Sequence, residues 1–220
     1  MEHLRSLDRR GWLVTIVLVP LLWWGPGLLW PYRHVVNLAA PGDLVVVLGD
    51  SVPAGFGDGV GVEKAWPTLV AQRLGLHLEN ESVPGDTTER AMTRLDKALA
   101  GHPRLVIVEL GGNDMLAHVA PETMKAHLDA IFERIQKGGA MIVYASVPTP
   151  LRGQYESAWV ASCREHGAWY VRDVLSGVFG SPRLMYDSIH PNAEGHEIIA
   201  QRMSGEISAL LKAADRARGR

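Results

Sequence analysis

One apolar run that stops abruptly constrains the fold of this chain more than any other feature. Val45 to Leu48 is three valines and a leucine, and Gly49 and Asp50 end the run directly before Ser51. A short β-branched run bounded by such breaks is typical of a buried strand that ends in a turn. In an open parallel sheet, ligands bind outside the carboxyl ends of the strands. The run therefore places Ser51 where catalytic residues are commonly found, although a serine at this position can also simply cap the next helix.

Apolar runs and helical periodicity alternate along the rest of the chain. Further strands are expected at residues 77–83, 105–110, 141–145 and 169–171. Helical spacing of apolar residues is found at 64–74, 88–100, 121–137, about 154–166 and about 193–212. This alternation predicts an α/β fold with a parallel sheet.

Composition narrows the class of protein. The 220 residues are 47% hydrophobic and 21% charged, which is typical of one globular domain with a sizeable core. The formal net charge of -2 and the lack of a basic run give no reason to expect a nucleic-acid partner. Cys163 is the single cysteine, so an internal disulfide is impossible. We expect Cys163 to be structural, and we expect neither a metal nor a cofactor.

The amino-terminal region has a second apolar feature. Residues 1–11 are polar and basic, and residues 12–30 contain no charged side chain. About 20 apolar residues are enough to cross a bilayer, and Trp12 and Trp30 are placed to lie at its two interfaces. The upstream arginines favour a cytoplasmic amino end. Pro20 argues against a straight helix.

Three interpretations of residues 12–30 compete. We rank an uncleaved membrane anchor first, with the following domain outside the cytoplasm, and an export signal second, because residues 37–40 offer a poor cleavage site. A buried core helix ranks last, since the stretch is apolar on every face. The remaining divisions expected are a linker at 31–42, a catalytic domain at 43–213 and a charged tail at 214–220.

An acid and a histidine lie together near the end of the chain. Asp187 precedes His190 by three residues, and Pro191 fits the first turn of the final helix. The acid can accept the Nδ1 proton within one turn of chain, which leaves Nε2 to take a proton from a serine. With 24 acids and 9 histidines, chance predicts about one such spacing, so the spacing alone is weak evidence.

Two further residues have the character of donors. Gly85 lies at a strand-to-helix junction, where its backbone N–H can point into a cleft, although a simple turn glycine is the ordinary alternative. Asn113 follows the run at 105–110 and can donate its side-chain amide to a developing oxyanion. The ordinary role of an Asn-Asp pair is a turn or a helix cap, and we expect that role for Asp114.

Four segments together carry a family resemblance. They resemble blocks I, II, III and V of the SGNH (GDSL) hydrolases, and they are Gly49-Asp50-Ser51, Pro84-Gly85-Asp86, Gly111-Gly112-Asn113-Asp114 and Asp187-Ser188-Ile189-His190-Pro191-Asn192. Trp66-Pro67 also matches, and Val52 stands where the family usually has leucine. The resemblance covers roughly residues 43–212 and is greatest to the small bacterial acyl-esterase, thioesterase and lysophospholipase branch.

This resemblance implies a fold and a set of roles. The implied fold is a three-layer α/β/α sandwich with a flavodoxin-like parallel sheet of about five strands. The resemblance does not extend to residues 12–30, so the apolar helix expected to precede this fold is inferred separately, from the composition of that stretch. Ser51 is implied as nucleophile, His190 as base and then acid, and Asp187 as the residue that orients it. The implied oxyanion hole is the N–H groups of Ser51 and Gly85 with the Asn113 side chain. An α/β-hydrolase is set aside, because its Gly-x-Ser-x-Gly elbow needs glycine where Pro53 stands.

The expected function is that of a metal-independent serine esterase that cleaves a carboxylic ester or thioester through an acyl-enzyme. Its expected partners are a small-molecule or lipid acyl ester, with lysophospholipid first, and a membrane through residues 12–30. A carbohydrate O-acetyl esterase is the alternative within the enzyme class. From another class, a non-catalytic binding module on the same fold is the alternative.

Overall fold

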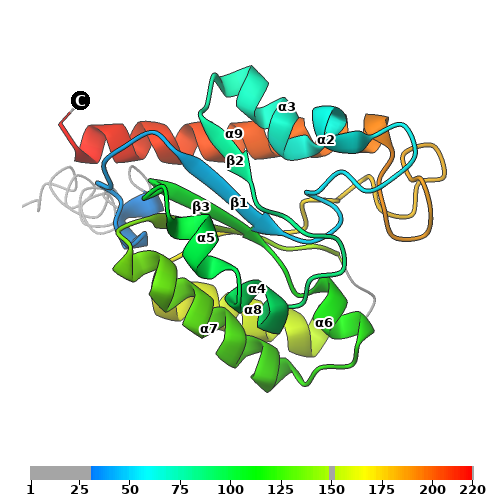
Figure 1. Ribbon diagram of the computed structural model, residues 1–220, viewed down its shortest axis with the longest axis horizontal. Helices are drawn as coiled ribbons and strands as arrows, with labels where there is room; N and C mark the ends of the chain where they lie inside the picture. Colours follow the sequence, from blue (N-terminus) through cyan, green and yellow to red (C-terminus); the bar gives the residue numbers. More distant parts are fainter. Residues whose placement is uncertain (1–30, 149–151, 220) are drawn as a thin grey trace, which may run out of the picture. The chain divides into compact units, whose positions relative to one another are not determined.

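The five predicted strands form one parallel sheet in the computed structural model, which describes residues 31–148 and 152–219 (Figure 1). The strand order is β2-β1-β3-β4-β5. The strands are β1 (Val45–Gly49), β2 (Leu78–Asn80), β3 (Leu105–Glu109), β4 (Met141–Ala145) and β5 (Trp169–Val171). β1, β3 and β4 are buried along their whole length, as expected of central parallel strands covered on both faces.

Helices cover both faces of this sheet, which confirms the predicted three-layer sandwich (Figure 1). One layer contains α3 (Trp66–Leu74) and α9 (Ala193–Ala217), preceded by the short α2 (Gly61–Lys64). The other contains α4 (Thr88–Met92), α5 (Leu95–Leu99), α7 (Pro121–Lys137) and α8 (Arg152–His166). The remaining helices are the short α6 (Gly112–Leu116) and the 3-10 helix η1 (Pro31–His34).

The chain divides into two units, Met1–Arg33 and His34–Arg220, and the fold above belongs to the second. The expected apolar helix and membrane anchor at residues 12–30 lie outside the described residues. Within residues 31–148 and 152–219, no helix combines the length and the apolar character needed to span a bilayer.

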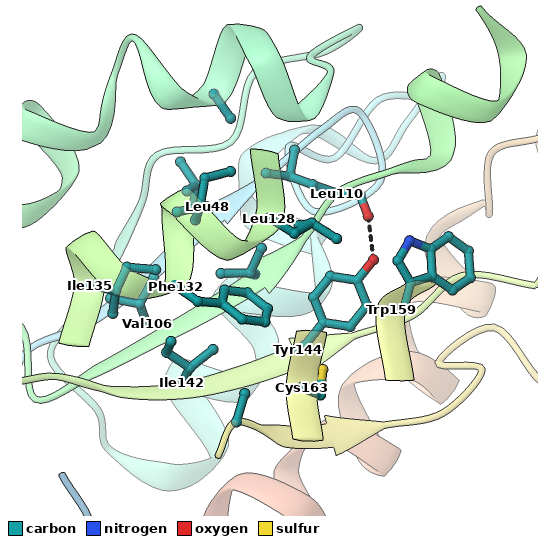
Figure 2. Packing of buried hydrophobic residues seen from close by; sticks show 14 of the residues in the cluster. Leu48, Val106, Leu110, Leu128, Phe132, Ile135, Ile142, Tyr144, Trp159 and Cys163 are labelled. Atoms are coloured by element: carbon teal, nitrogen blue, oxygen red, sulfur yellow. Dashed lines mark hydrogen bonds between the residues drawn. The ribbon is translucent and has the colours of Figure 1, made fainter. Parts of the chain in front are cut away.

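The core on the α7 and α8 side is built around aromatic side chains of the sheet and helices (Figure 2). Tyr144 of β4 is fully buried, and its hydroxyl donates to the Leu110 carbonyl at 2.7 Å. Phe132 packs edge-on against Tyr144, with 6.0 Å between the ring centroids. Cys163 is buried in the same cluster, where burial raises the pKa of its thiol. The expectation that Cys163 is structural fits this position.

Two helical segments differ by more than two residues from those expected from periodicity. The segment 88–100 contains two short helices, and between them the Thr93 hydroxyl donates to the Arg90 carbonyl at 2.7 Å. The final helix continues to Ala217, so most of the expected tail at 214–220 belongs to α9. Ala214 is fully buried there, which explains why the helix continues.

The segment 31–42 is expected from the sequence to be a linker. In the structure, residues 35–40 of this segment pack against the folded unit. Val35 and Ala40 are buried. The Asn37 side chain donates to the carbonyls of Gln136 and Ala140, at 3.0 and 3.1 Å. Residues 35–40 are therefore part of the folded unit, and the reason is a set of contacts with residues about a hundred positions away, which the local sequence does not show.

Candidate active site

The tight turn after β1 presents Ser51 at the carboxyl edge of the sheet. A Cβ at Gly49 would collide with the Pro53 ring and lie 3.1 Å from the Glu109 carbonyl oxygen, so only glycine fits where the strand ends. The Val52 N–H donates to Asp50 Oδ1 at 3.2 Å and closes the turn. Ser51 thereby leaves the strand and lines a cavity.

His190 is held beside Ser51 by its own loop. Asp187 Oδ1 accepts the backbone N–H groups of Ile189 and His190, each at 2.7 Å, and this local turn places the carboxylate under the imidazole. His190 Nδ1 lies 2.8 Å from Asp187 Oδ2, and His190 Nε2 lies 3.0 Å from Ser51 Oγ. The structure therefore brings the three side chains into one line of hydrogen bonds.

The electrostatics of this line suit a histidine that becomes charged. Desolvation acts to raise the pKa of Asp187, but hydrogen bonds from the His190 side chain and from the His190 and Ile189 amides outweigh it and lower that pKa to about 2. The carboxylate is therefore ionised at any ordinary working pH. An ionised acid on Nδ1 holds the imidazole in the tautomer whose Nε2 can accept a proton.

Asn113 reaches the same cavity from the end of β3. The chain enters α6 through Gly111 at a φ of 104°, where a Cβ would lie 2.9 Å from the Trp159 ring nitrogen. The Asn113 side-chain amide donates to the Asp86 carbonyl at 2.9 Å and to Asp50 Oδ2 at 3.3 Å. Asn113 and Ser51 line one cavity, so the amide and the hydroxyl face the same space.

Gly85 lies next to this group but outside the residues that line the cavity. It adopts a φ of 79°, which favours glycine, and open space surrounds the position that a Cβ would take. The carbonyl of the following residue, Asp86, accepts the Asn113 amide. The Gly85 turn is therefore tied to Asn113 through one intervening residue.

Asp114 is expected from its sequence to form a turn or to cap the next helix, but its side chain instead caps the amino end of the earlier helix α4. Its side chain is fully buried, with Oδ2 accepting the Thr88 N–H at 2.9 Å and Oδ1 accepting the Thr88 hydroxyl at 2.5 Å. His127 Nδ1 contacts the same hydroxyl at 3.1 Å. This contact fixes the loop after Gly85 relative to Asn113, and no local pattern in the sequence predicts it.

Two buried acids near Ser51 are a further feature that sequence reasoning missed. Burial raises the pKa of Asp50 to about 6, and burial also raises that of Glu109 well above its ordinary value. The Trp66 ring N–H donates to Glu109 Oε2 at 3.1 Å. Burial disfavours the ionised form of each acid, so Asp50 holds its proton up to a higher pH than an exposed aspartate does.

The cavity itself is largely apolar. Its volume is about 470 Å³, and Ser51, Asn113 and His190 line it together with Asp50 and Gly112. Its apolar lining is supplied by Val52, Met115, Leu116, Val147, Pro148, Leu175, Phe179 and Ile189. A mostly apolar cavity with a few convergent polar groups is the usual form of a small-molecule site.

The amino-acid sequence is similar to a known protein family and to several characterised proteins. The sequence model of the GDSL-like Lipase/Acylhydrolase family matches residues 47–198. The chain is 30% identical to the Thioesterase 1/protease 1/lysophospholipase L1 of Escherichia coli (strain K12) over 82% of this chain and 92% of that protein. It is 29% identical to an Arylesterase of Vibrio mimicus over 74% of this chain and 87% of that protein.

A solved structure agrees with these relatives. The psychrotrophic esterase EstA from Pseudoalteromonas sp., in a crystal structure inhibited by monoethylphosphonate, superposes with a TM-score of 0.72 and 26% identity. The match covers 78% of this chain and all of that one. The family match, residues 47–198, includes Ser51, Asn113, Asp187 and His190.

Proposed function

Because the chain belongs to the GDSL-like lipase/acylhydrolase family, we propose that Ser51, His190 and Asp187 are the catalytic triad with which this serine esterase hydrolyses acyl esters. The observation that carries the assignment is the line of hydrogen bonds from Asp187 through His190 to Ser51. A serine hydroxyl is a weak nucleophile until a base takes its proton, and this geometry supplies the base.

The reaction follows from the positions of the atoms. Ser51 Oγ attacks the acyl carbonyl carbon while His190 Nε2 takes the hydroxyl proton, and the ionised Asp187 stabilises the imidazolium. His190 then gives that proton to the leaving alcohol or thiol, which departs and leaves an acyl-Ser51 ester. A water molecule, deprotonated by the same Nε2, attacks the acyl-enzyme, and the carboxylic acid is released as Ser51 regains its proton.

The oxyanion formed in each step needs fixed donors. We assign the backbone N–H groups of Ser51 and Gly85 and the Asn113 side chain to this role. The Asn113 amide donates at 2.9 Å to the Asp86 carbonyl and at 3.3 Å to Asp50 Oδ2. The longer of these two bonds is the one that an oxyanion would replace.

The apolar cavity supports an acyl group as the part of the substrate that binds beside Ser51. An acetyl group would fill only a small part of about 470 Å³, so the cavity favours longer acyl chains over the O-acetyl groups of carbohydrates. The names of the relatives cover thioesters, lysophospholipids and aryl esters. We propose carboxylic esters and thioesters of apolar acyl groups as substrates, with lysophospholipids first.

We further propose that residues 12–30 anchor the protein in a membrane and hold the catalytic unit outside the cytoplasm. The support is the uncharged stretch with arginines before it and tryptophans at both ends. Fractionation of cells that express the full chain tests this. Recovery with the membranes, and release of the catalytic unit by an external protease, is expected. Full recovery in the soluble cytosol rejects it.

The experiment for the triad is Ser51→Ala assayed on p-nitrophenyl butyrate. Turnover should fall by roughly 10⁴- to 10⁶-fold, because the nucleophile is removed while the fold is kept. The matched control is Ser157→Ala, an exposed serine of α8, which should turn over as the wild type does. A fluorophosphonate should label the wild type at one site and should not label Ser51→Ala. Retained turnover in Ser51→Ala overturns the assignment. A wild type that neither turns over the ester nor is labelled by the fluorophosphonate would favour a binding module.

A further inference from the structure

The loop that follows Ser51 brings an aromatic side chain onto the catalytic imidazole. The ring centroids of Phe56 and His190 are 4.5 Å apart, with 48° between the ring planes. Phe56 is 46% exposed, whereas Phe132 is fully buried in the core. Phe56 is also outside the set of residues that line the cavity. Its contact with His190 is therefore neither core packing nor part of the acyl site.

The backbone of the loop is built to hold Phe56 at this place. The Phe56 N–H donates to the Ser51 carbonyl at 3.0 Å, and the Gly55 N–H donates to the Val52 carbonyl at 3.0 Å. Gly55 has a φ of 79°, and a Cβ there would meet the Gly61 backbone. The turn that sets the nucleophile thus also sets the start of the Phe56 side chain.

The hydrogen bonds of the His190 imidazole do not by themselves cover the two faces of its ring. Asp187 and Ser51 occupy its two nitrogens, and these bonds lie in the plane of the ring. They direct the nitrogens but leave the faces of the ring to other neighbours. The His190 side chain is only 14% exposed although the Asp187 side chain is 40% exposed, so His190 is covered from outside its hydrogen-bond line.

We propose that Phe56 is a positioning residue for His190. Its ring keeps the imidazole aligned between Ser51 and Asp187, and its π face stabilises the imidazolium that forms whenever Nε2 takes a proton. The inference rests on the proposed function, because it acts through the base of that reaction. Phe56 itself touches neither the substrate nor the reacting oxygen.

The charged surroundings of His190 stay constant when Phe56 is replaced. Asp187 contacts the ring directly, and Asp50 and His196 interact with it electrostatically. Asp187 and His196 lie on other segments, whereas Asp50 precedes Ser51 at the start of the turn and the exposed Asp58 follows Phe56. Substitution of the Phe56 side chain leaves all of these groups in the chain. A change in the pH profile of Phe56→Leu that Phe56→Tyr reverses therefore reports the loss of the aromatic ring.

The test compares Phe56→Leu, which keeps an apolar cover without a π face, with Phe56→Tyr, which keeps the ring. In Phe56→Leu, kcat on p-nitrophenyl butyrate should fall about three- to thirtyfold with KM nearly unchanged. The acid limb of the kcat/KM profile should move to lower pH, because the imidazolium has lost a stabilising contact. Phe56→Tyr should restore both values. Val62→Ala, an exposed apolar residue of α2, is the matched control and should match the wild type.

Three results overturn the inference. One is an unchanged kcat and acid limb in Phe56→Leu, and another is a loss carried by KM alone, which would make Phe56 a substrate contact. The third is a loss in Phe56→Tyr as large as in Phe56→Leu. Thermal melting checks that each variant folds, and Phe56→Met supplies a second apolar replacement without an aromatic ring. If Ser51→Ala stays active, the proposed function fails; if only the Phe56 series is flat, the triad stands and this inference alone fails.

Discussion

The amino ends of the parallel strands form one edge of the sheet and their carboxyl ends form the other. The polar groups at these two edges have different roles. At the amino edge, the Val36 N–H donates to the Gly167 carbonyl at 3.0 Å, just before β5. The Asn37 side chain donates to the carbonyls of Gln136 in the last turn of α7 and of Ala140 just before β4. At the carboxyl edge, Ser51, Asn113 and His190 line a cavity. Polar groups of both edges bond other protein groups, but only those at the carboxyl edge also line a cavity that a substrate can fill.

Exposed apolar side chains also contribute to the cavity. Of the eight large apolar side chains that are at least 40% exposed among the described residues, Leu116, Phe179 and Ile189 line the cavity. Leaving them exposed forgoes hydrophobic burial that the rest of the fold obtains. The comparison teaches that residues of the carboxyl edge are placed for binding and chemistry, whereas those of the amino edge are placed for stability. Substitutions at the two edges should therefore have different signatures.

The largest effect is expected for Asp187→Asn. Loss of the Asp187 negative charge beside His190 Nδ1 disfavours both the tautomer with a free Nε2 lone pair and the imidazolium. We therefore expect kcat to fall by roughly 10⁴-fold. The free energy of unfolding should change by less than about 1 kcal/mol, because Asp187 is a partly exposed residue and asparagine can still accept the two loop amides. Assays on p-nitrophenyl butyrate and urea unfolding measure the two quantities. A stability loss with normal kcat would break the comparison.

Asn113→Ala should come second. Removal of one oxyanion donor typically costs about 10²- to 10³-fold in kcat, and KM should change little because the donor acts on the transition state. Steady-state kinetics on the same ester checks this. A drop smaller than about threefold would remove Asn113 from the oxyanion hole.

Asp50 is an exception to this comparison of the two edges. It lies at the carboxyl edge, but it is buried and is expected to affect stability. Burial raises its pKa from 3.8 to about 6, so the folded state binds the proton more tightly than the unfolded state. Its contribution to stability is full below pH 3.8 and is lost as the pH rises to about 6. The cost is about 3 kcal/mol on the linkage relation.

Asp50→Asn cannot ionise, so it should lack this loss. Its free energy of unfolding, measured in urea at pH 4.5 and pH 7.5, should fall less between the two values than that of the wild type. Comparing each protein with itself removes the constant cost of the altered contact with Asn113. Parallel behaviour of the two proteins would contradict the raised pKa.

The smallest effect is expected for Asn37→Gly. This variant tests whether a residue of the amino edge contributes to stability alone. The side chain donates two hydrogen bonds, and their loss should cost about 1–3 kcal/mol of unfolding free energy with kcat unchanged. Asn37 has a φ of 59°, which glycine tolerates, so this variant removes the side chain without backbone strain. Asn37→Ala should have a lower free energy of unfolding than Asn37→Gly, because alanine is strained at a φ of 59°. Equal free energies of unfolding in the two variants would mean that the backbone at residue 37 adjusts to a negative φ.

Local chemistry explains how much of the fold could be predicted. β4, β5 and α7 have the expected ends, because apolar runs, helical periodicity and the breaks at glycine and proline all act within a few residues. The pairing of Asp187 with His190 is local in the same sense, since one turn of chain contains both. The split of 88–100 into two helices was missed because the apolar spacing continues through the break at Thr93.

What the sequence determined by itself is therefore the parallel α/β order, the breaks that end β1 and β3, and the residue types placed at those breaks. Only the tertiary structure decided that Asp114 caps α4, that Asp50 and Glu109 are buried, and that Phe56 covers His190. The physical reason is distance along the chain: Ser51 and His190 are separated by 139 positions, and their contact depends on how the layers pack. Side-chain patterns report short-range geometry, whereas burial and desolvation exist only once the whole sheet and its helices are assembled.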